Sequence, residues 1–114
     1  MSDKRNTRRA PLDIYLNKYI SGVPYMTRCS DISQEGVNLA HLIEPQHGGK
    51  RVGLQFQLPG TDEVIYAEGE VVREWVDSSQ QGSGVRFTLL TERHRRMIDK
   101  YIKRHARAGD EARK

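Results

Sequence analysis

The alternation of apolar and other residues along Arg51-Val52-Gly53-Leu54-Gln55-Phe56-Gln57-Leu58 is the clearest structural signal in the sequence. Side chains that alternate with a period of two point to opposite faces of a β-strand. Every second residue from Val52 onward is apolar, and the residues between are polar or glycine. The segment therefore predicts a strand with one face turned toward a core.

Turn-forming residues divide most of the remaining chain into further short strands. Pro59-Gly60-Thr61-Asp62 predicts a hairpin turn and Ser21-Gly22-Val23-Pro24 another turn, because proline and glycine favour the backbone angles of turns. Gly69, within a long strand-like segment, predicts a bend or bulge. The expected strands cover residues 12–16, 25–29, 37–42, 51–58, 64–76 and 83–89.

A basic amphipathic helix is expected after the last strand. Thr91 is suited to cap its N-terminus. The helix would turn one apolar face inward and basic residues outward; the inner residues are Met97, Ile98, Tyr101 and Ile102, and the outer ones are Arg93, Arg96, Lys100 and Lys103. Short strands followed by one helix predict a mainly β protein, a small antiparallel barrel whose open end the helix covers. Closing the sheet removes its exposed edges.

The net charge of +4 is unevenly distributed along the 114 residues. Residues 1–10 carry four basic groups and one acidic group, residues 11–92 six and eleven, and residues 93–114 nine and three. A protein that binds nucleic acids in general more often has a basic body. Basic ends on an acidic body instead suit a compact anionic ligand or a partner surface. We expect a mobile arm at 1–10, the barrel with its helix at 11–105, and a frayed tail at 106–114.

Composition limits the remaining classes. The sequence contains no run of 18 apolar residues, so it predicts no membrane span. No apolar segment follows Met1, so it predicts no secretory signal. A single cysteine, Cys29, cannot form an internal disulfide. A cytoplasmic location is therefore expected. The four histidines, at positions 41, 47, 94 and 105, lack the spacing of a zinc site, and Cys29 and Ser33 lack a nucleophile's surroundings. We therefore expect that the protein is not an enzyme and that it binds no metal ion and no cofactor.

Two short motifs carry the chemistry. The first is the arginine cluster Arg5-Asn6-Thr7-Arg8-Arg9, and the second is the turn Asp31-Ile32-Ser33-Gln34-Glu35-Gly36. Planar guanidinium groups bind phosphates, stack on bases and reach guanine O6 and N7, whereas small polar groups suit the remaining base edge. Taken separately, each motif has a plainer interpretation, as a solvated arm and as an ordinary turn. The arginine spacing fits a helical turn and an extended arm equally well.

In this order, the two motifs resemble the R-x-x-x-R and [D/N]-x-S-x-x-G patterns of the PilZ domain, a bacterial receptor for cyclic di-GMP. Gly82–Phe87, Leu89 and Asp99–Ile102 are similar to the family's last strand and closing helix, so the resemblance spans about residues 4–105. It implies a six-stranded barrel and a cyclic di-GMP site formed by Arg5, Arg8, Arg9, Asp31, Ser33 and Gly36. Arg5 and Arg9 would bind or stack on guanine, and Arg8 would contact phosphate. Asp31 and Ser33 would bind a guanine edge. Gly36 would allow a positive φ or a close approach of the ligand.

The resemblance implies a stand-alone receptor in which the ligand orders residues 1–11 onto the barrel. The signal would pass to an unidentified partner protein, with or without a change of oligomeric state, toward motility, pili, exopolysaccharide or virulence. Lys4, just before the first motif, bears on whether one or two ligands bind, and the basic arm favours two. One alternative is a PilZ-like adaptor that binds protein and no cyclic di-GMP. The other is a small nucleic-acid-binding barrel, which the 7% aromatic content disfavours.

Overall fold

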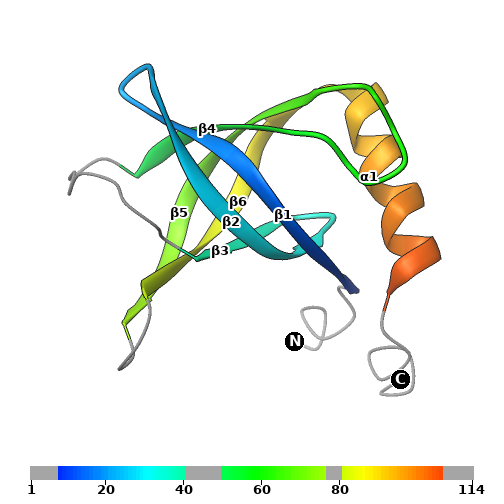
Figure 1. Ribbon diagram of the computed structural model, residues 1–114, viewed down its shortest axis with the longest axis horizontal. Coiled ribbons are helices and arrows are strands. Elements are labelled where there is room, and N and C mark those ends of the chain that lie inside the picture. Colours follow the sequence, from blue (N-terminus) through cyan, green and yellow to red (C-terminus); the bar gives the residue numbers. More distant parts are fainter. Residues whose placement is uncertain (1–7, 41–49, 77–80, 107–114) are drawn as a thin grey trace.

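The computed structural model describes residues 8–40, 50–76 and 81–106. Six strands and one helix occupy this part of the chain (Figure 1): β1 (Arg9–Ile20), β2 (Val23–Ser33), β3 (Gly36–Ala40), β4 (Arg51–Phe56), β5 (Ile65–Val76), β6 (Gln81–Leu90) and α1 (Glu92–His105). All neighbouring strands are antiparallel, and they close into a barrel in the order β1-β2-β3-β6-β5-β4. The predicted fold class is confirmed.

β1 and β2 form a hairpin much longer than the sequence predicts, with 12 and 11 residues. Their turn consists of Ser21 and Gly22 alone, so Val23 and Pro24 lie in β2 and not in the turn as predicted. Pro11 lies inside β1, next to a shift in register between Pro11 and Ile14. Proline is tolerated at such irregularities because its missing N–H costs the sheet no regular hydrogen bond.

The start of β1 also revises the expected arm. Arg9 and Ala10 belong to β1, and Ala10 is fully buried in the core. The barrel therefore begins earlier than the expected boundary after residue 10. Residues 1–7 of the expected arm and residues 107–114 of the expected tail lie outside the described residues.

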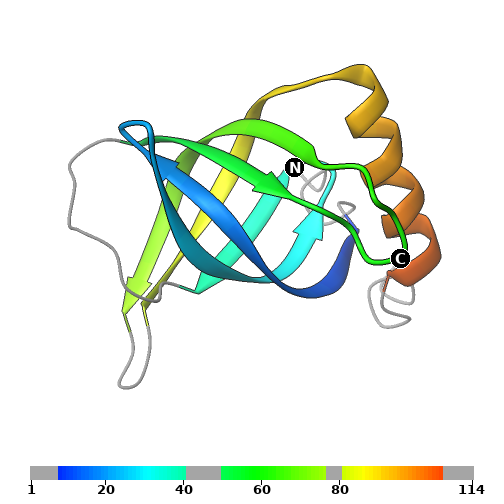
Figure 2. The ribbon, with the colours of Figure 1, turned by 45° about the horizontal axis from the view of Figure 1, so that its top comes forward.

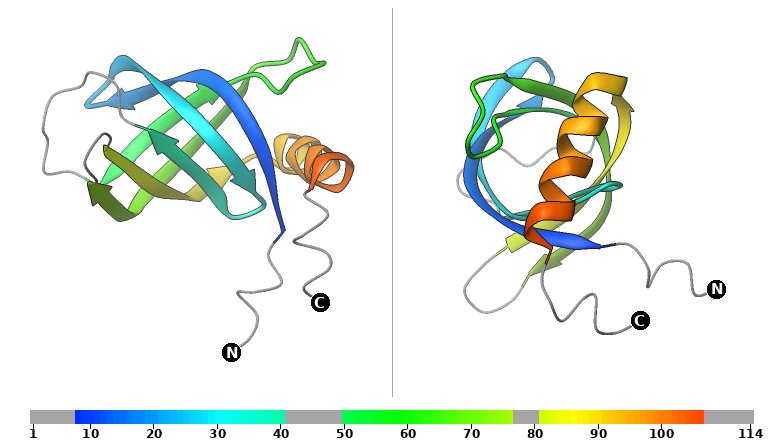
Figure 3. Two further views of the ribbon diagram at one scale, coloured as in Figure 1. Left: turned by 60° about the horizontal axis from the view of Figure 1, so that its bottom comes forward. Right: turned by 90° about the vertical axis from the view of Figure 1, so that its right-hand side faces the viewer.

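The core fills the barrel and extends under the helix. Leu12, Leu39, Leu54 and Ile65 are at most 1% exposed inside the barrel. Ile98 and Ile102 of α1 are equally buried and belong to the same cluster. Figure 2 shows α1 at one end of the barrel, with the β1–β2 turn toward the other, and in the right-hand view of Figure 3 the helix crosses the barrel's end. The predicted position and inner face of the helix are confirmed.

Side-chain contacts hold the start of α1 against the segment between β4 and β5. The turn predicted in this segment is present, with the Thr61 amide donating to the Leu58 carbonyl at 3.2 Å. Farther along, the Arg93 guanidinium donates to both oxygens of Glu63, at 2.6 to 3.0 Å. Thr91 caps the helix as predicted, because its side chain accepts from the His94 amide. The helix start is thus tied to the barrel by side chains as well as by the chain itself.

The remaining strands follow the predicted pattern with shifted ends. Val52, Leu54, Phe56 and Leu58 are all buried, although β4 itself ends at Phe56. The predicted bulge at Gly69 is confirmed by a shift in the pairing of β5 with β6 between Glu68 and Gly69. The strand predicted at 37–42 is β3, which ends at Ala40; His41 and Leu42 lie outside the described residues.

Candidate functional site

Arg9 and Asp31, one from each predicted motif, meet on the surface of the barrel. Antiparallel pairing of β1 with β2 brings the beginning of one strand beside the end of the other, with Arg9 opposite Ser33 and Pro11 opposite Asp31. The Arg9 Nε and Nη2 atoms both lie 2.7 Å from Asp31 Oδ1. The two side chains are 37% and 22% exposed, so solvent and ligands can reach them.

The Asp31 carboxylate is also held from the opposite side. Asn38 of β3 donates through Nδ2 to Asp31 Oδ1 at 3.0 Å and to Oδ2 at 3.3 Å. Arg73 of β5 donates through Nη2 to Asn38 Oδ1 at 2.9 Å. The Arg73 guanidinium lies 5.1 Å from the centre of the Trp75 ring. A row of polar groups therefore crosses the barrel surface from β1 to β5, and we refer to Arg9, Asp31, Asn38, Arg73 and Trp75 as the polar row.

The polar row crosses β6 where that strand has no side chain. An added Cβ at Gly84 would lie 3.2 Å from Asn38 Oδ1 and 3.4 Å from Arg73 Nη2. The absence of a side chain at Gly84 therefore leaves room for Arg73 to reach Asn38. Sequence reasoning missed Asn38, Arg73 and Trp75. Antiparallel pairing across the motif turn places Asn38 opposite Asp31, which is the signal that could have found it.

Ser33 lies inside the motif turn and not on the surface. It is fully buried, and its Oγ accepts from the Glu35 amide at 3.1 Å and from the Gly36 amide at 3.2 Å. A serine hydroxyl that binds nearby backbone amides stabilises a turn. The part that Ser33 plays here is to hold the turn behind Asp31, and a direct ligand contact by Ser33 stays a prediction.

Gly36 is required by the neighbouring strand. Its φ lies outside the left-handed region, which among the described glycines only Gly22 and Gly60 adopt, so the predicted positive φ is wrong. A Cβ on Gly36 would lie 2.0 Å from the Val85 carbonyl oxygen of β6. The close approach that needs a glycine here is therefore made by the backbone of β6.

The other predicted site residues are described only in part. Arg8 is half-buried and directly precedes β1, next to Arg9. Arg5 and Lys4 lie outside the described residues. The structure thus brings Arg9, Asp31, Ser33 and Gly36 into one region, with Arg8 at its edge.

Cys29 is buried beneath this region. Its side chain is fully buried in β2, and burial raises the pKa of the thiol to about 12, with Asp31 adding to the increase. A thiol that stays protonated in the core is a poor nucleophile. In the described ranges no group of three His, Cys, Asp or Glu residues is placed to hold a metal ion. The described helix is too short and too polar to span a membrane.

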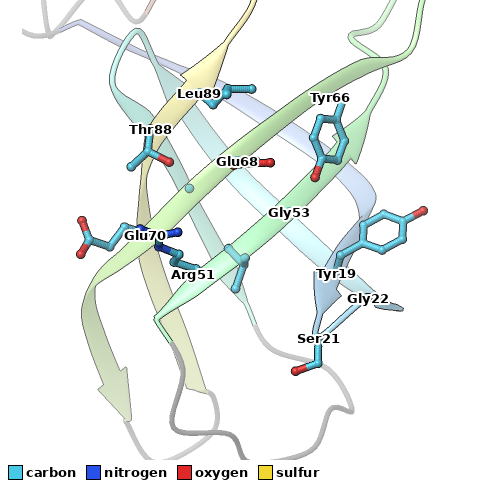
Figure 4. A pocket seen from close by; sticks show the side chains of 12 residues that line it. Tyr19, Ser21, Gly22, Arg51, Gly53, Tyr66, Glu68, Glu70, Thr88 and Leu89 are labelled. Carbon is cyan, nitrogen blue, oxygen red and sulfur yellow. The ribbon is translucent and has the colours of Figure 1, made fainter.

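A separate hollow of about 670 Å³ lies over β4, β5 and β6 (Figure 4). Tyr19, Tyr66 and Glu68 surround Gly53 there, and Arg51 lies close to Glu70. Glu70 is paired with Arg86 at 2.5 Å. No predicted site residue lines this hollow. It is therefore a second candidate ligand site, separate from the polar row, and experiments can distinguish the two.

The fold and the two motifs define the class of small closed antiparallel barrels with a helix over one end. The sequence profile of the PilZ domain matches residues 3–104. The match covers most of the chain, and the protein belongs to the PilZ domain family. The search of curated proteins returned no match.

Solved structures share this fold at low sequence identity. The inhibitor of motility MotI/DgrA from Bacillus subtilis superposes with a TM-score of 0.76 at 16% identity, over 86% of this chain and 49% of that chain. The PilZ domain of YcgR from Escherichia coli, with cyclic di-GMP, gives 0.63 at 15% identity, over 94% and 92%. PlzA from Borreliella burgdorferi, in complex with cyclic di-GMP, gives 0.59 at 14%, over 82% and 39%.

The chain spans about half the length of MotI/DgrA and less of PlzA. Identities of 14–16% support a shared barrel and helix and do not carry individual ligand contacts from one protein to another.

Proposed function

We propose that this protein is a cyclic di-GMP receptor whose ligand binds at the polar row, with one guanine between Arg9 and Asp31. Membership of the PilZ family supports the ligand class. The observation that carries the proposal is the meeting of Arg9 and Asp31 on an accessible surface, held from behind by Asn38.

The chemistry of guanine fits this pair. A guanidinium can donate two parallel hydrogen bonds to O6 and N7, and a carboxylate accepts from the N–H groups of the base. Arg9 and Asp31 are bound to each other, so each already has a partner of opposite charge. A guanine that presents acceptors to Arg9 and donors to Asp31 would replace this pair without leaving either group buried and unpaired.

The arm would supply the remaining positive charge. Arg8 precedes β1 directly, so Arg5 and Arg8 can be drawn toward the phosphates when the residues that precede β1 close over the ligand. Arg73 beside Trp75 offers a further planar cation at the far end of the row. This supply of cations favours two stacked ligands over one, although Lys4 lacks the planar surface that an arginine would offer there.

Isothermal titration calorimetry with cyclic di-GMP tests the proposal. We expect Arg9→Ala to weaken binding by on the order of 2 kcal/mol, because it removes charge-assisted contacts, and Arg9→Lys to restore little, because lysine lacks the planar fork. Arg51→Ala, an exposed arginine in the separate hollow, is the matched control and should leave affinity unchanged. The same titrations, with the active protein fraction measured independently, give the stoichiometry.

Two results would reject the proposal. Absence of binding to the wild-type protein would favour an adaptor that recognises only protein. Tighter binding to a single-stranded oligonucleotide than to cyclic di-GMP would favour a nucleic-acid-binding barrel. If cyclic di-GMP binds as proposed, the output passes to a downstream protein, and a motility, pilus, exopolysaccharide or virulence system remains the proposed context.

A further inference from the structure

A groove of about 320 Å³ lies between α1 and the segment that connects β4 to β5. Leu58 is buried in its lining, and Met97 and Tyr101 are partly buried. Lys100, Arg104 and His105 are exposed on the helix side. The groove therefore combines an apolar floor with a basic edge.

In the part of the chain that the structure describes, no carboxylate neutralises the positive charge along this groove. Its lining contains no carboxylate. Elsewhere on α1, Arg93, Arg96 and Lys103 pair with Glu63, Glu92 and Asp99. Among the described residues, no carboxylate pairs with Lys100 or Arg104. Residues four apart lie on one face of a helix, so these two cations act along the same edge.

The surroundings argue against two kinds of anionic partner. A membrane-binding helix needs a free apolar face, whereas Ile98 and Ile102 are 1% exposed in the core. A long nucleic acid would meet the acidic body of residues 11–92. The Tyr101 ring packs against His105 at 4.4 Å between centroids, and its hydroxyl donates to the Pro11 carbonyl at 2.8 Å. Tyr101 is thus engaged and not available to stack on a base.

We propose that this groove is a docking site for a short acidic segment of a partner protein that carries an apolar side chain among its carboxylates. The apolar side chain would lie against Leu58 and Met97. The carboxylates would pair with Lys100 and Arg104. The basic edge requires a partner of negative charge, and the apolar floor distinguishes this site from a general basic surface.

Two contacts connect the groove to the polar row. Tyr101 binds the carbonyl of Pro11, two residues after Arg9. The Gln34 amide in the motif turn donates to Asp99, which lies next to Lys100. Through these contacts, cyclic di-GMP bound at the polar row could influence the docking site, and this part of the inference rests on the proposed function. The docking site itself does not depend on the proposed function.

The test is fluorescence anisotropy of the full chain, without nucleotide, with a labelled synthetic peptide rich in glutamate around one leucine. A second peptide with serine in place of the leucine reports the apolar floor. We expect the double variant Lys100→Glu/Arg104→Glu to bind the leucine peptide at least about tenfold more weakly than wild type, and the milder Lys100→Gln/Arg104→Gln pair to fall between them. The serine peptide should bind wild type several-fold more weakly.

Arg95→Glu is the matched control, because Arg95 lines a different hollow beside Gln34 and Glu92. It makes the same charge change as the single groove substitution Lys100→Glu, but outside the groove, and should alter binding by less than about twofold. Circular dichroism of each variant checks that the fold is kept. The proposal is overturned if wild type binds neither peptide, if Arg95→Glu weakens binding as much as one groove substitution, or if leucine makes no difference. It is also overturned if an oligonucleotide of equal charge or anionic vesicles bind the groove more tightly than the peptide.

Discussion

Single residues show how one pair of charges can serve both the fold and a ligand. Arg9 reaches Asp31 through two nitrogen atoms, and Asn38 holds the same carboxylate from the next strand. Both side chains remain partly exposed, so the pair is screened by water and adds little stability. Its value under our proposal is that both groups are held side by side, so that one guanine can replace the contact between them.

The motif turn gives a prediction that separates structural from ligand-contacting residues. Ser33→Ala leaves two backbone amides without their acceptor, and Gly36→Ala forces a Cβ against the Val85 carbonyl. We expect each to lower the free energy of unfolding by roughly 1–3 kcal/mol. Urea denaturation measures this loss. Ser30→Ala, on the exposed side of β2, is a control that should change stability far less. A Ser33→Ala protein of unchanged stability that no longer binds cyclic di-GMP would instead make Ser33 a direct ligand contact.

At the scale of elements, the contacts of Glu63 with the start of α1 predict that the stability of the fold depends on pH. Hydrogen bonds from Arg93 lower the pKa of Glu63 from 4.5 to about 2, partial desolvation opposes this shift, and His94 adds to it. A carboxyl group with a lowered folded-state pKa contributes its stability fully above the unfolded-state value and loses it as pH falls. The contribution should therefore be complete above about pH 4.5 and disappear toward pH 2.

Thermal unfolding of wild type and Glu63→Gln between pH 2.5 and 6 checks this prediction. Wild type should be the more stable protein at pH 6, and the difference should shrink as the pH falls below about 4.5. Glu68→Gln, a solvent-exposed carboxylate of β5, is the control. A constant difference between wild type and Glu63→Gln across the range would show that the Glu63 charge does not fasten the helix.

The elements also show what the sequence could and could not predict. Alternation located β4 correctly and Thr91 located the start of α1, because both signals are local. The lengths of β1 and β2 depend on their pairing with each other, and this pairing carries Pro11 and Pro24 into strands despite their turn propensity. The motifs located Arg9 and Asp31, whereas Arg73 joined the row only through the barrel's closure, which no local pattern encodes.

For the whole molecule, the barrel places its helix within reach of the candidate ligand site. Figure 3 shows the start of β1 beside the end of α1, where Tyr101 binds the Pro11 carbonyl. Tyr101→Phe removes only this hydroxyl and costs about 1 kcal/mol. We expect faster amide hydrogen exchange at Arg9, Ala10 and Leu12. Tyr25→Phe, on the β1–β2 hairpin, serves as the control for loss of a tyrosine hydroxyl. Unchanged exchange at the start of β1 in Tyr101→Phe would disconnect the helix from the ligand site.

The position of the ligand is the central claim, and hydrogen exchange of the whole chain with and without cyclic di-GMP tests it most directly. The two candidate regions share no lining residue: the polar row is formed by Arg9, Asp31, Asn38, Arg73 and Trp75, whereas the hollow lies around Gly53 and Tyr66. We predict that saturating ligand protects residues 1–8 and 30–38 and leaves the amides around Gly53 and Tyr66 unchanged. Protection centred on Gly53, or equal exchange of residues 1–8 in the two states, would contradict this prediction.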